Sequence, residues 1–187
     1  MGYSSLLVTG VVIAALLMWI VAAYNGLVTL RVRTQNAWSE IDVQLKRRHD
    51  LIPNLVEAVR GYMQHERSTL EGVTQARAQA VAASSGSVQQ RNNAESALSG
   101  ALGKLFAVAE NYPQLRAVES VQLLQEQLTS TENRIAYARQ FYNDEVMKYN
   151  TAQSTFPRNL LSGVLGFSQA TMFTAQDGER APVQVKI

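Results

Sequence analysis

The chain has 187 residues and no cysteine, which excludes disulfides, thiolate metal sites and cysteine nucleophiles. Its net charge of +2, with 17% charged residues, is too weak for a typical nucleic-acid-binding domain. Aromatic residues make up only 7% of the chain, whereas Ala, Gln, Leu and Val are abundant. This composition favours long helices over β-sandwiches.

The first thirty residues contain no charged side chain. From Leu6 to Ala23 the sequence is apolar except for Thr9 and Gly10. As a helix this run is roughly 27 Å long, close to the thickness of the hydrocarbon core of a bilayer. Trp19 and Tyr24 lie towards its end, where amphipathic rings favour the headgroup region. We therefore predict a transmembrane anchor over residues 1–26, with the lipid bilayer as its partner.

A cleaved signal peptide is the alternative interpretation of this run. Ala22 and Ala23 resemble a cleavage site. However, the preceding residues MGYSS carry no Lys or Arg, and the run exceeds the about 7–15 apolar residues of a signal peptide. The transmembrane interpretation is preferred.

Residues 27–155 are expected to form a helical bundle. Apolar residues spaced by three and four predict that the first helix continues from the membrane to about Arg48. His49-Asp50 is the expected interruption, with Asp50 capping a second helix and Pro53 in its first turn. A kink at Pro53 instead of a reversal is the alternative. Trp38 adjoins the apolar stripe and is expected to anchor one helix to another.

Three further helices are predicted at residues 51–83, 88–110 and 114–153. Ser84 to Ser87 and Asn111 to Pro113 would separate them. Gly61 and Gly72 are expected to be close-packing positions. Short connections between long helices imply antiparallel neighbours, so the predicted fold is all-α: one transmembrane helix continuing into an elongated antiparallel bundle of coiled-coil type.

Residues 156–187 form a third segment, because Phe156-Pro157 should stop the fourth helix. A glycine-broken apolar cluster follows, and the rest is expected to be a loose tail. The cluster could dock on its own bundle, on a neighbouring copy or in the membrane interface, and docking on a bundle is favoured; its members are Leu160, Leu161, Val164, Leu165 and Phe167.

Few residues suggest a catalytic or ligand-binding site. The two histidines, His49 and His65, lack the HExxH and Glu-x-x-His spacings of metal sites, and we expect both to be exposed. The basic cluster Lys46 to Arg48 would suit nucleic acid or anionic lipid, but cations at a helix C-terminus are also favoured by the macrodipole. Polar residues at 132–134 and 139–143 are expected to fix helix register or to form an oligomer surface. No catalytic, cofactor-binding or metal-ligating residue is predicted.

Two blocks of the sequence carry specific patterns. The first is Tyr24-Asn25-Gly26-Leu27-Val28 with Arg31 and the segment from Asn36 to Val56 (NAWSEIDVQLKRRHDLIPNLV). The second runs from Glu132 to Phe167; its residues are Glu132-Asn133-Arg134-Ile135-Ala136, Arg139, Tyr142-Asn143, Tyr149-Asn150, Phe156-Pro157, Asn159-Leu160 and Gly166-Phe167. Both blocks resemble the LemA family, and the resemblance ends near Ser168.

The resemblance implies a bacterial protein with one N-terminal membrane helix, a domain of long helices, no established activity and no cofactor. A family member of magnetotactic bacteria belongs to the machinery of magnetosome membrane formation, which suggests membrane shaping or scaffolding. We therefore expect a self-associating scaffold, with an adaptor for a membrane protein such as a protease as the alternative and an enzyme third.

The sequence also predicts the orientation of the protein in the membrane and its association with copies of itself. Arg31, Arg33 and Lys46 to Arg48 follow the span and nothing basic precedes it, so the helical domain is predicted to be cytoplasmic, with the N-terminus outside the inner membrane. Gly10 and the alanines of the anchor would permit close approach between copies, so a homo-oligomer is expected.

Overall fold

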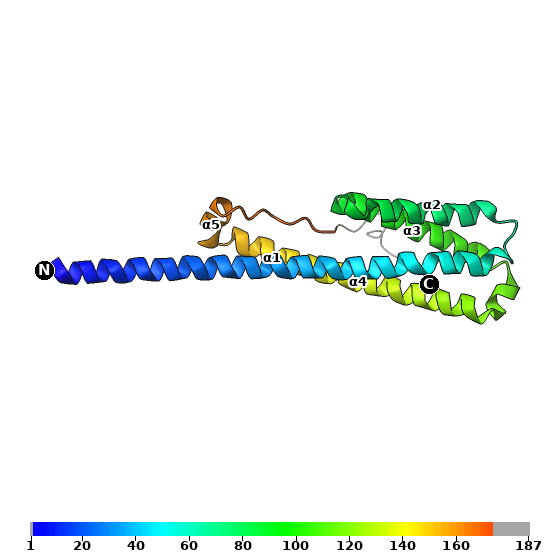
Figure 1. Cartoon of the computed structure of the whole chain (residues 1–187), viewed down its shortest axis with the longest axis horizontal. Coiled ribbons are helices and arrows are strands. Elements are labelled where there is room, and N and C mark those ends of the chain that lie inside the picture. Colours follow the sequence, from blue (N-terminus) through cyan, green and yellow to red (C-terminus); the bar gives the residue numbers. More distant parts are fainter. Residues whose placement is uncertain (1, 174–187) are drawn as a thin grey trace, which may run out of the picture. The chain divides into compact units, whose positions relative to one another are not determined.

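The structure is a computed structural model that describes residues 2–173. In that range the chain forms five α-helices and two 3-10 helices and no β-strand, so the predicted all-α class is confirmed. The elements are α1 (Gly2–Arg60), α2 (Arg67–Ala82), η1 (Ala83–Ser85), α3 (Val88–Ala109), η2 (Pro113–Ala117), α4 (Glu119–Ser154) and α5 (Arg158–Val164), as Figure 1 shows.

The described residues separate into two compact units. The first unit contains residues 2–40 and 140–171, and the second contains residues 41–139 with Met172 and Phe173. Helices α1 and α4 each contribute residues to both units, whereas α2 and α3 belong entirely to the second. The predicted division into residues 1–26, 27–155 and 156–187 rests on the chemical character of the segments and stays a prediction.

The N-terminal part of α1 is apolar and exposed. Leu6, Val12 and Leu17 are 70%, 60% and 56% exposed, and side chains from Tyr3 to Trp19 are exposed throughout. Within the described residues, this is the one helix long and apolar enough to cross a membrane. The observation is compatible with the predicted anchor.

Helix α1 continues past His49-Asp50, so the predicted interruption there is wrong. Pro53 lies inside the helix and has no N–H to donate to the carbonyl of His49, four residues earlier. Nε of Arg77, on α2, lies 2.7 Å from that carbonyl oxygen and donates to it instead. A side chain from another helix thus supplies the hydrogen bond that Pro53 removes, and α1 runs on to Arg60.

Asp50 therefore caps no helix. Its carboxylate accepts a hydrogen bond of 2.6 Å from Lys46, one turn earlier on α1. This hydrogen bond holds the pKa of the exposed Asp50 carboxyl below its usual value. The chain turns instead at residues 61–66, so the predicted helix from Leu51 to Ala83 is divided between α1 and α2.

The remaining helix boundaries agree with the prediction more closely. α3 begins with a capping box, in which the Ser87 side chain accepts from the Gln90 N–H and the Gln90 side chain accepts from the Ser87 N–H. Gly61 and Gly72 are not close-packing positions, since a Cβ added to either would meet nothing within 4 Å. Gly61 begins the turn after α1, and Gly72 is an exposed residue of α2.

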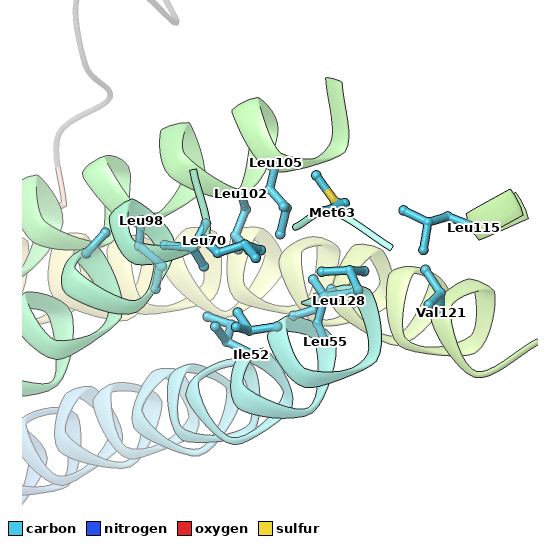
Figure 2. Packing of buried hydrophobic residues seen from close by; sticks show 14 of the residues in the cluster. Ile52, Leu55, Met63, Leu70, Leu98, Leu102, Leu105, Leu115, Val121 and Leu128 are labelled. Carbon is cyan, nitrogen blue, oxygen red and sulfur yellow. The ribbon is translucent and has the colours of Figure 1, made fainter. Parts of the chain in front are cut away.

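The core of the second unit is a layer of aliphatic side chains from α1, α2, α3, η2 and α4 (Figure 2). Burying one such side chain contributes about 1.5–3 kcal/mol. Nearly all come from positions spaced by three and four along their helices; the labelled members are Ile52, Leu55, Met63, Leu70, Leu98, Leu102, Leu105, Leu115, Val121 and Leu128.

The first unit joins α1 to the C-terminal part of α4. Ala37 on α1 and Val146 on α4 are fully buried. The half-buried indole of Trp38 meets the Tyr142 ring edge-on, with centroids 5.3 Å apart and planes at 62°. Trp38 is thus the inter-helix anchor that the sequence predicts.

The role of Arg77 gives a first testable prediction. Arg77→Ala should cost about 1–3 kcal/mol, because the His49 carbonyl then loses its donor. Pro53→Ala restores a backbone N–H at the position four residues after His49, so Arg77→Ala should cost clearly less in a Pro53→Ala background. Thermal unfolding of the four proteins in detergent, followed by circular dichroism, measures this coupling.

Arg67→Ala provides the matched control, because the Arg67 side chain is 87% exposed on the same helix. An equal loss of stability from Arg77→Ala with and without Pro53 would contradict the account.

Candidate functional site

The most distinctive chemistry of the second unit is a set of charged and polar side chains that joins α1, α2, α3 and α4. Arg48 and Glu95 lie at its centre and are only 2% and 1% exposed. Nη1 of Arg48 lies 3.4 Å from Oε2 of Glu95. We call this set the charge network; its members are Asp42, Arg48, His49, Arg77, Arg91, Glu95, Ser99 and Glu132.

The second end of the Arg48 guanidinium connects α3 and α4. Its Nη2 donates to Oγ of Ser99 at 2.7 Å and lies 3.3 Å from Oε2 of Glu132. Ser99 in turn donates to the other carboxylate oxygen of Glu132 at 3.2 Å. One arginine of α1 therefore binds two carboxylates, one from each of two other helices, and fixes the relative register of these residues.

His49 is buried, so the prediction that it is exposed is wrong. Its Nε2 lies 2.9 Å from Oε1 of Glu95, the oxygen that Arg48 does not contact. The His49 ring and the Glu95 carboxylate are thus hydrogen-bonded to each other inside the second unit. His65 is exposed as predicted, in the turn between α1 and α2.

A second ion pair extends the charge network along α1 and α3. Nη2 of the buried Arg91 donates to Oδ1 of Asp42, and Nη1 lies 3.4 Å from the Ser84 carbonyl oxygen. Arg91 thus connects α3 both to α1 and to η1, which follows α2. The capping box at Ser87 starts α3 one turn before this arginine.

The charged side chains around the network bind one another or the backbone. Beside the network lies a groove of about 500 Å³, lined by residues of α1, α2 and α3 that include His49, Arg77 and Arg91. Its charged groups already have partners: Lys46 binds Asp50, Arg91 binds Asp42, and Arg77 binds the His49 carbonyl. Among the described residues, His, Asp and Glu side chains form no group of three that could hold a metal ion.

The structure also corrects the interpretation of Lys46 to Arg48. These residues lie inside α1, away from its end, so the macrodipole does not explain them. Arg48 is a buried ion-pair partner, and Lys46 pairs with Asp50 on the surface. The expectation that the polar residues at 132–134 fix register is confirmed for Glu132.

In the first unit, the chain after α5 is bound along α4. The side chain of Asn150 donates to the Ala170 carbonyl and accepts from the Ala170 N–H, both at 2.9 Å. Oη of Tyr142 donates to the Thr171 carbonyl at 2.9 Å, and burial raises the pKa of this hydroxyl above its usual value. We call residues 165–171 the strap.

The turn between α5 and the strap depends on Gly166. Its φ of +73° lies in the left-handed region, which favours glycine. The Phe167 N–H donates to the Ser162 carbonyl at 3.0 Å, as in a Schellman motif at the end of a helix. Oγ of the buried Ser162 lies 3.3 Å from the Gln153 carbonyl, one of the last carbonyls of α4. α5 is therefore fixed to the end of α4.

Helix α5 and the strap also contact α1. The Phe167 ring meets the Tyr24 ring edge-on at 5.8 Å, and the Arg158 guanidinium lies next to Gly26. One side of the apolar cluster is thus docked within its own chain, as expected. The other side remains exposed: Leu160 is 64% and Val164 is 85% exposed.

Glu95 provides the test of the charge network. Glu95→Leu should cost about 3–5 kcal/mol in thermal or denaturant unfolding, because Arg48 stays buried with one of its two counter-ions gone. Replacing both partners by apolar residues of similar volume, Arg48→Met with Glu95→Leu, should recover most of this loss.

The matched control is Glu71→Leu, which removes an exposed ion pair to Arg67 on α2. Surface pairs contribute about 0–1 kcal/mol, so its effect should be small. If Glu95→Leu were as mild as Glu71→Leu, the network would not stabilise the second unit.

Comparisons with known proteins match this chain to one family. The model of the LemA family matches residues 37–187. Magnetosome proteins MamQ 1 and MamQ 2 of Paramagnetospirillum magneticum are each 28% identical to the chain over 91% of its length and 70% of theirs. Magnetosome protein MamQ of Magnetospirillum gryphiswaldense is 24% identical over 86% of this chain and 68% of its own.

Several residues of the two blocks that resemble the family lie at the two places described above. Arg48, His49 and Pro53 belong to the charge network and its helix, and Asn150 and the segment Gly166-Phe167 hold the strap and α5. Since the family model covers most of the chain, this protein belongs to the LemA family.

Proposed function

We propose that this protein is a membrane-anchored scaffold that associates with copies of itself and helps to organise or shape the membrane. The proposal rests on where the charged and the apolar side chains lie within the described residues. The charges best placed for chemistry are buried and bind one another, whereas the exposed surface of α1 is apolar over a membrane's width. Such a chain is suited to holding a rigid helical domain at a bilayer, and we propose that it does so without catalysis.

The relatives support a role at membranes. The matched proteins are named as magnetosome proteins, and the family resemblance stated above implies a part in forming the magnetosome membrane. Transferring this context to the present chain is part of the proposal. Together with the apolar span of α1, the family context leads us to propose the bacterial inner membrane as the location of this protein.

Self-association is proposed to begin in the anchor. Gly10 and Ala14 are four residues apart and so share one face of α1. Small residues at this spacing let helix backbones approach closely in lipid, where van der Waals packing replaces the hydrophobic driving force. No atom lies within 4 Å of a Cβ added at Gly10, so this face has room for a second helix.

The alternative function is an adaptor that presents a membrane protein, such as a protease, to its substrates. A groove of about 900 Å³ in the second unit favours this candidate. Met63 and Leu70 form part of its floor, and Arg60, Arg67 and Glu71 line it as well. A mixed apolar and charged groove between α1 and α2 is suited to a short amphipathic segment of a partner.

The size of the full-length protein in mild detergent tests self-association. Light scattering should give a particle mass well above the 20.6 kDa of one chain, after correction for detergent. Gly10→Ile with Ala14→Ile should lower that mass, because the larger side chains separate the backbones. Val11→Ile with Val12→Ile is the control, and it should leave the mass unchanged.

A monomer in both detergent and cross-linked native membranes would overturn the scaffold and favour the adaptor.

Orientation provides a separate test. The Lys/Arg residues after the span predict that the helical domain faces the cytoplasm. A reporter that works only in the cytoplasm should therefore be active when fused after Ile187, and one that works only in the periplasm should be inactive. The reverse pattern would contradict the proposed orientation without affecting the anchor.

A further inference from the structure

Helix α5 is held beside the end of the apolar run of α1. Two contacts in the first unit place it there: the Phe167 ring against Tyr24, and the Arg158 guanidinium against Gly26. Tyr24 and Gly26 follow the last residue of the run, Ala23, by one and three positions. At about 1.5 Å per residue, both contacts lie within about 5 Å of the end of the run.

This distance corresponds to the headgroup layer of a bilayer. The hydrocarbon core is about 30 Å thick, and the headgroups add roughly 5–7 Å on each side. With the run from Leu6 to Ala23 in the hydrocarbon, Tyr24 and Gly26 lie in the headgroup layer. Phe167 and Arg158, which contact them, lie there as well. Trp19 and Tyr24 are the ring types that favour this boundary.

Several large apolar side chains of α5 and its flanking residues are exposed, beside the polar Asn159. Four large apolar side chains at and around this helix are exposed: Phe156 by 74%, Leu160 by 64%, Val164 by 85% and Leu165 by 39%. No charged residue lies between Arg158 and Phe167 in the sequence. Arg158 is half-buried against α1, where its long side chain can reach lipid phosphates.

We infer that α5 is an interfacial foot: its exposed apolar side chains enter the boundary between headgroups and acyl chains next to the span of α1. Lipid is the occupant at this depth, because the neighbouring run of α1 is itself surrounded by lipid in the proposed function, on which this inference rests. The foot would fix the first unit against the membrane surface at a second point and restrict its tilt about the anchor.

Depth-dependent quenching in vesicles tests the inference with the full-length chain. Because the chain has no cysteine, one introduced cysteine can be labelled with an environment-sensitive fluorophore. The test positions are Leu160→Cys and Val164→Cys, both exposed, so little packing is lost. Leu16→Cys, in the apolar run, reports the anchor, and Met147→Cys is the matched control, an exposed apolar residue of α4 in the same unit.

The vesicles contain phosphatidylcholine and phosphatidylglycerol in equal amounts. Labels at 160 and 164 should be quenched by lipids with a nitroxide near the headgroup and should be protected from aqueous iodide. The label at 147 should show the opposite pattern, and the label at 16 should be quenched by nitroxides deep in the acyl chains.

Iodide quenching at 160 and 164 equal to that at 147, with position 16 protected, would overturn the foot and leave the anchor intact. Protection that is lost when the protein is diluted with excess lipid would also overturn it, since a second copy would then cover α5. Iodide quenching at 16 would overturn the proposed anchor, and the foot with it.

Discussion

The burial of Arg48 and Glu95 is the constraint on which the second unit depends. Two charges removed from water are tolerated only when their geometry and additional hydrogen bonds offset the loss of hydration. Here the offset comes from three helices, α1, α3 and α4, through His49, Ser99 and Glu132. Hydrophobic burial is non-directional, whereas this set of hydrogen-bonding partners is complete in one register.

The same place in the fold explains how α1 remains a single helix. Pro53 removes one backbone hydrogen bond, and Arg77 replaces it from α2 at 2.7 Å. Helix α1 carries the apolar run and contributes residues to both compact units. In the first unit, the strap binds α4 through Asn150, and the Phe167 ring contacts Tyr24 of α1.

Much of this fold could be predicted from the sequence, because apolar spacing identifies long helices and a long uncharged run identifies the possible span. The interruption at His49-Asp50 was mispredicted because helix signals are local, whereas the donor for the orphaned carbonyl comes from Arg77, 28 residues away. The burial of Arg48 and Glu95, in contrast, has a signal in the sequence. Arg48 falls between Leu45 and Ile52 at the inward spacing of α1, and Glu95 precedes Leu98 at the inward spacing of α3.

The strap and α5 were harder to foresee, since their positions depend on single side-chain contacts to backbone groups. Gly166 interrupts the apolar cluster in the sequence, but nothing in the spacing indicates that Asn150 binds Ala170 or that Phe167 meets Tyr24. The sequence therefore left three placements open for this segment.

Hydrogen exchange of the full-length protein in lipid nanodiscs tests the central claim, that one unbroken α1 is held by the charge network. The account predicts slow amide exchange throughout Arg31 to Arg60, with residues 45–56 among the slowest in the domain, and a sharp increase at residues 61–66. Fast exchange at residues 46–52, between protected flanking segments, would show that α1 breaks at His49-Asp50 and would contradict the account.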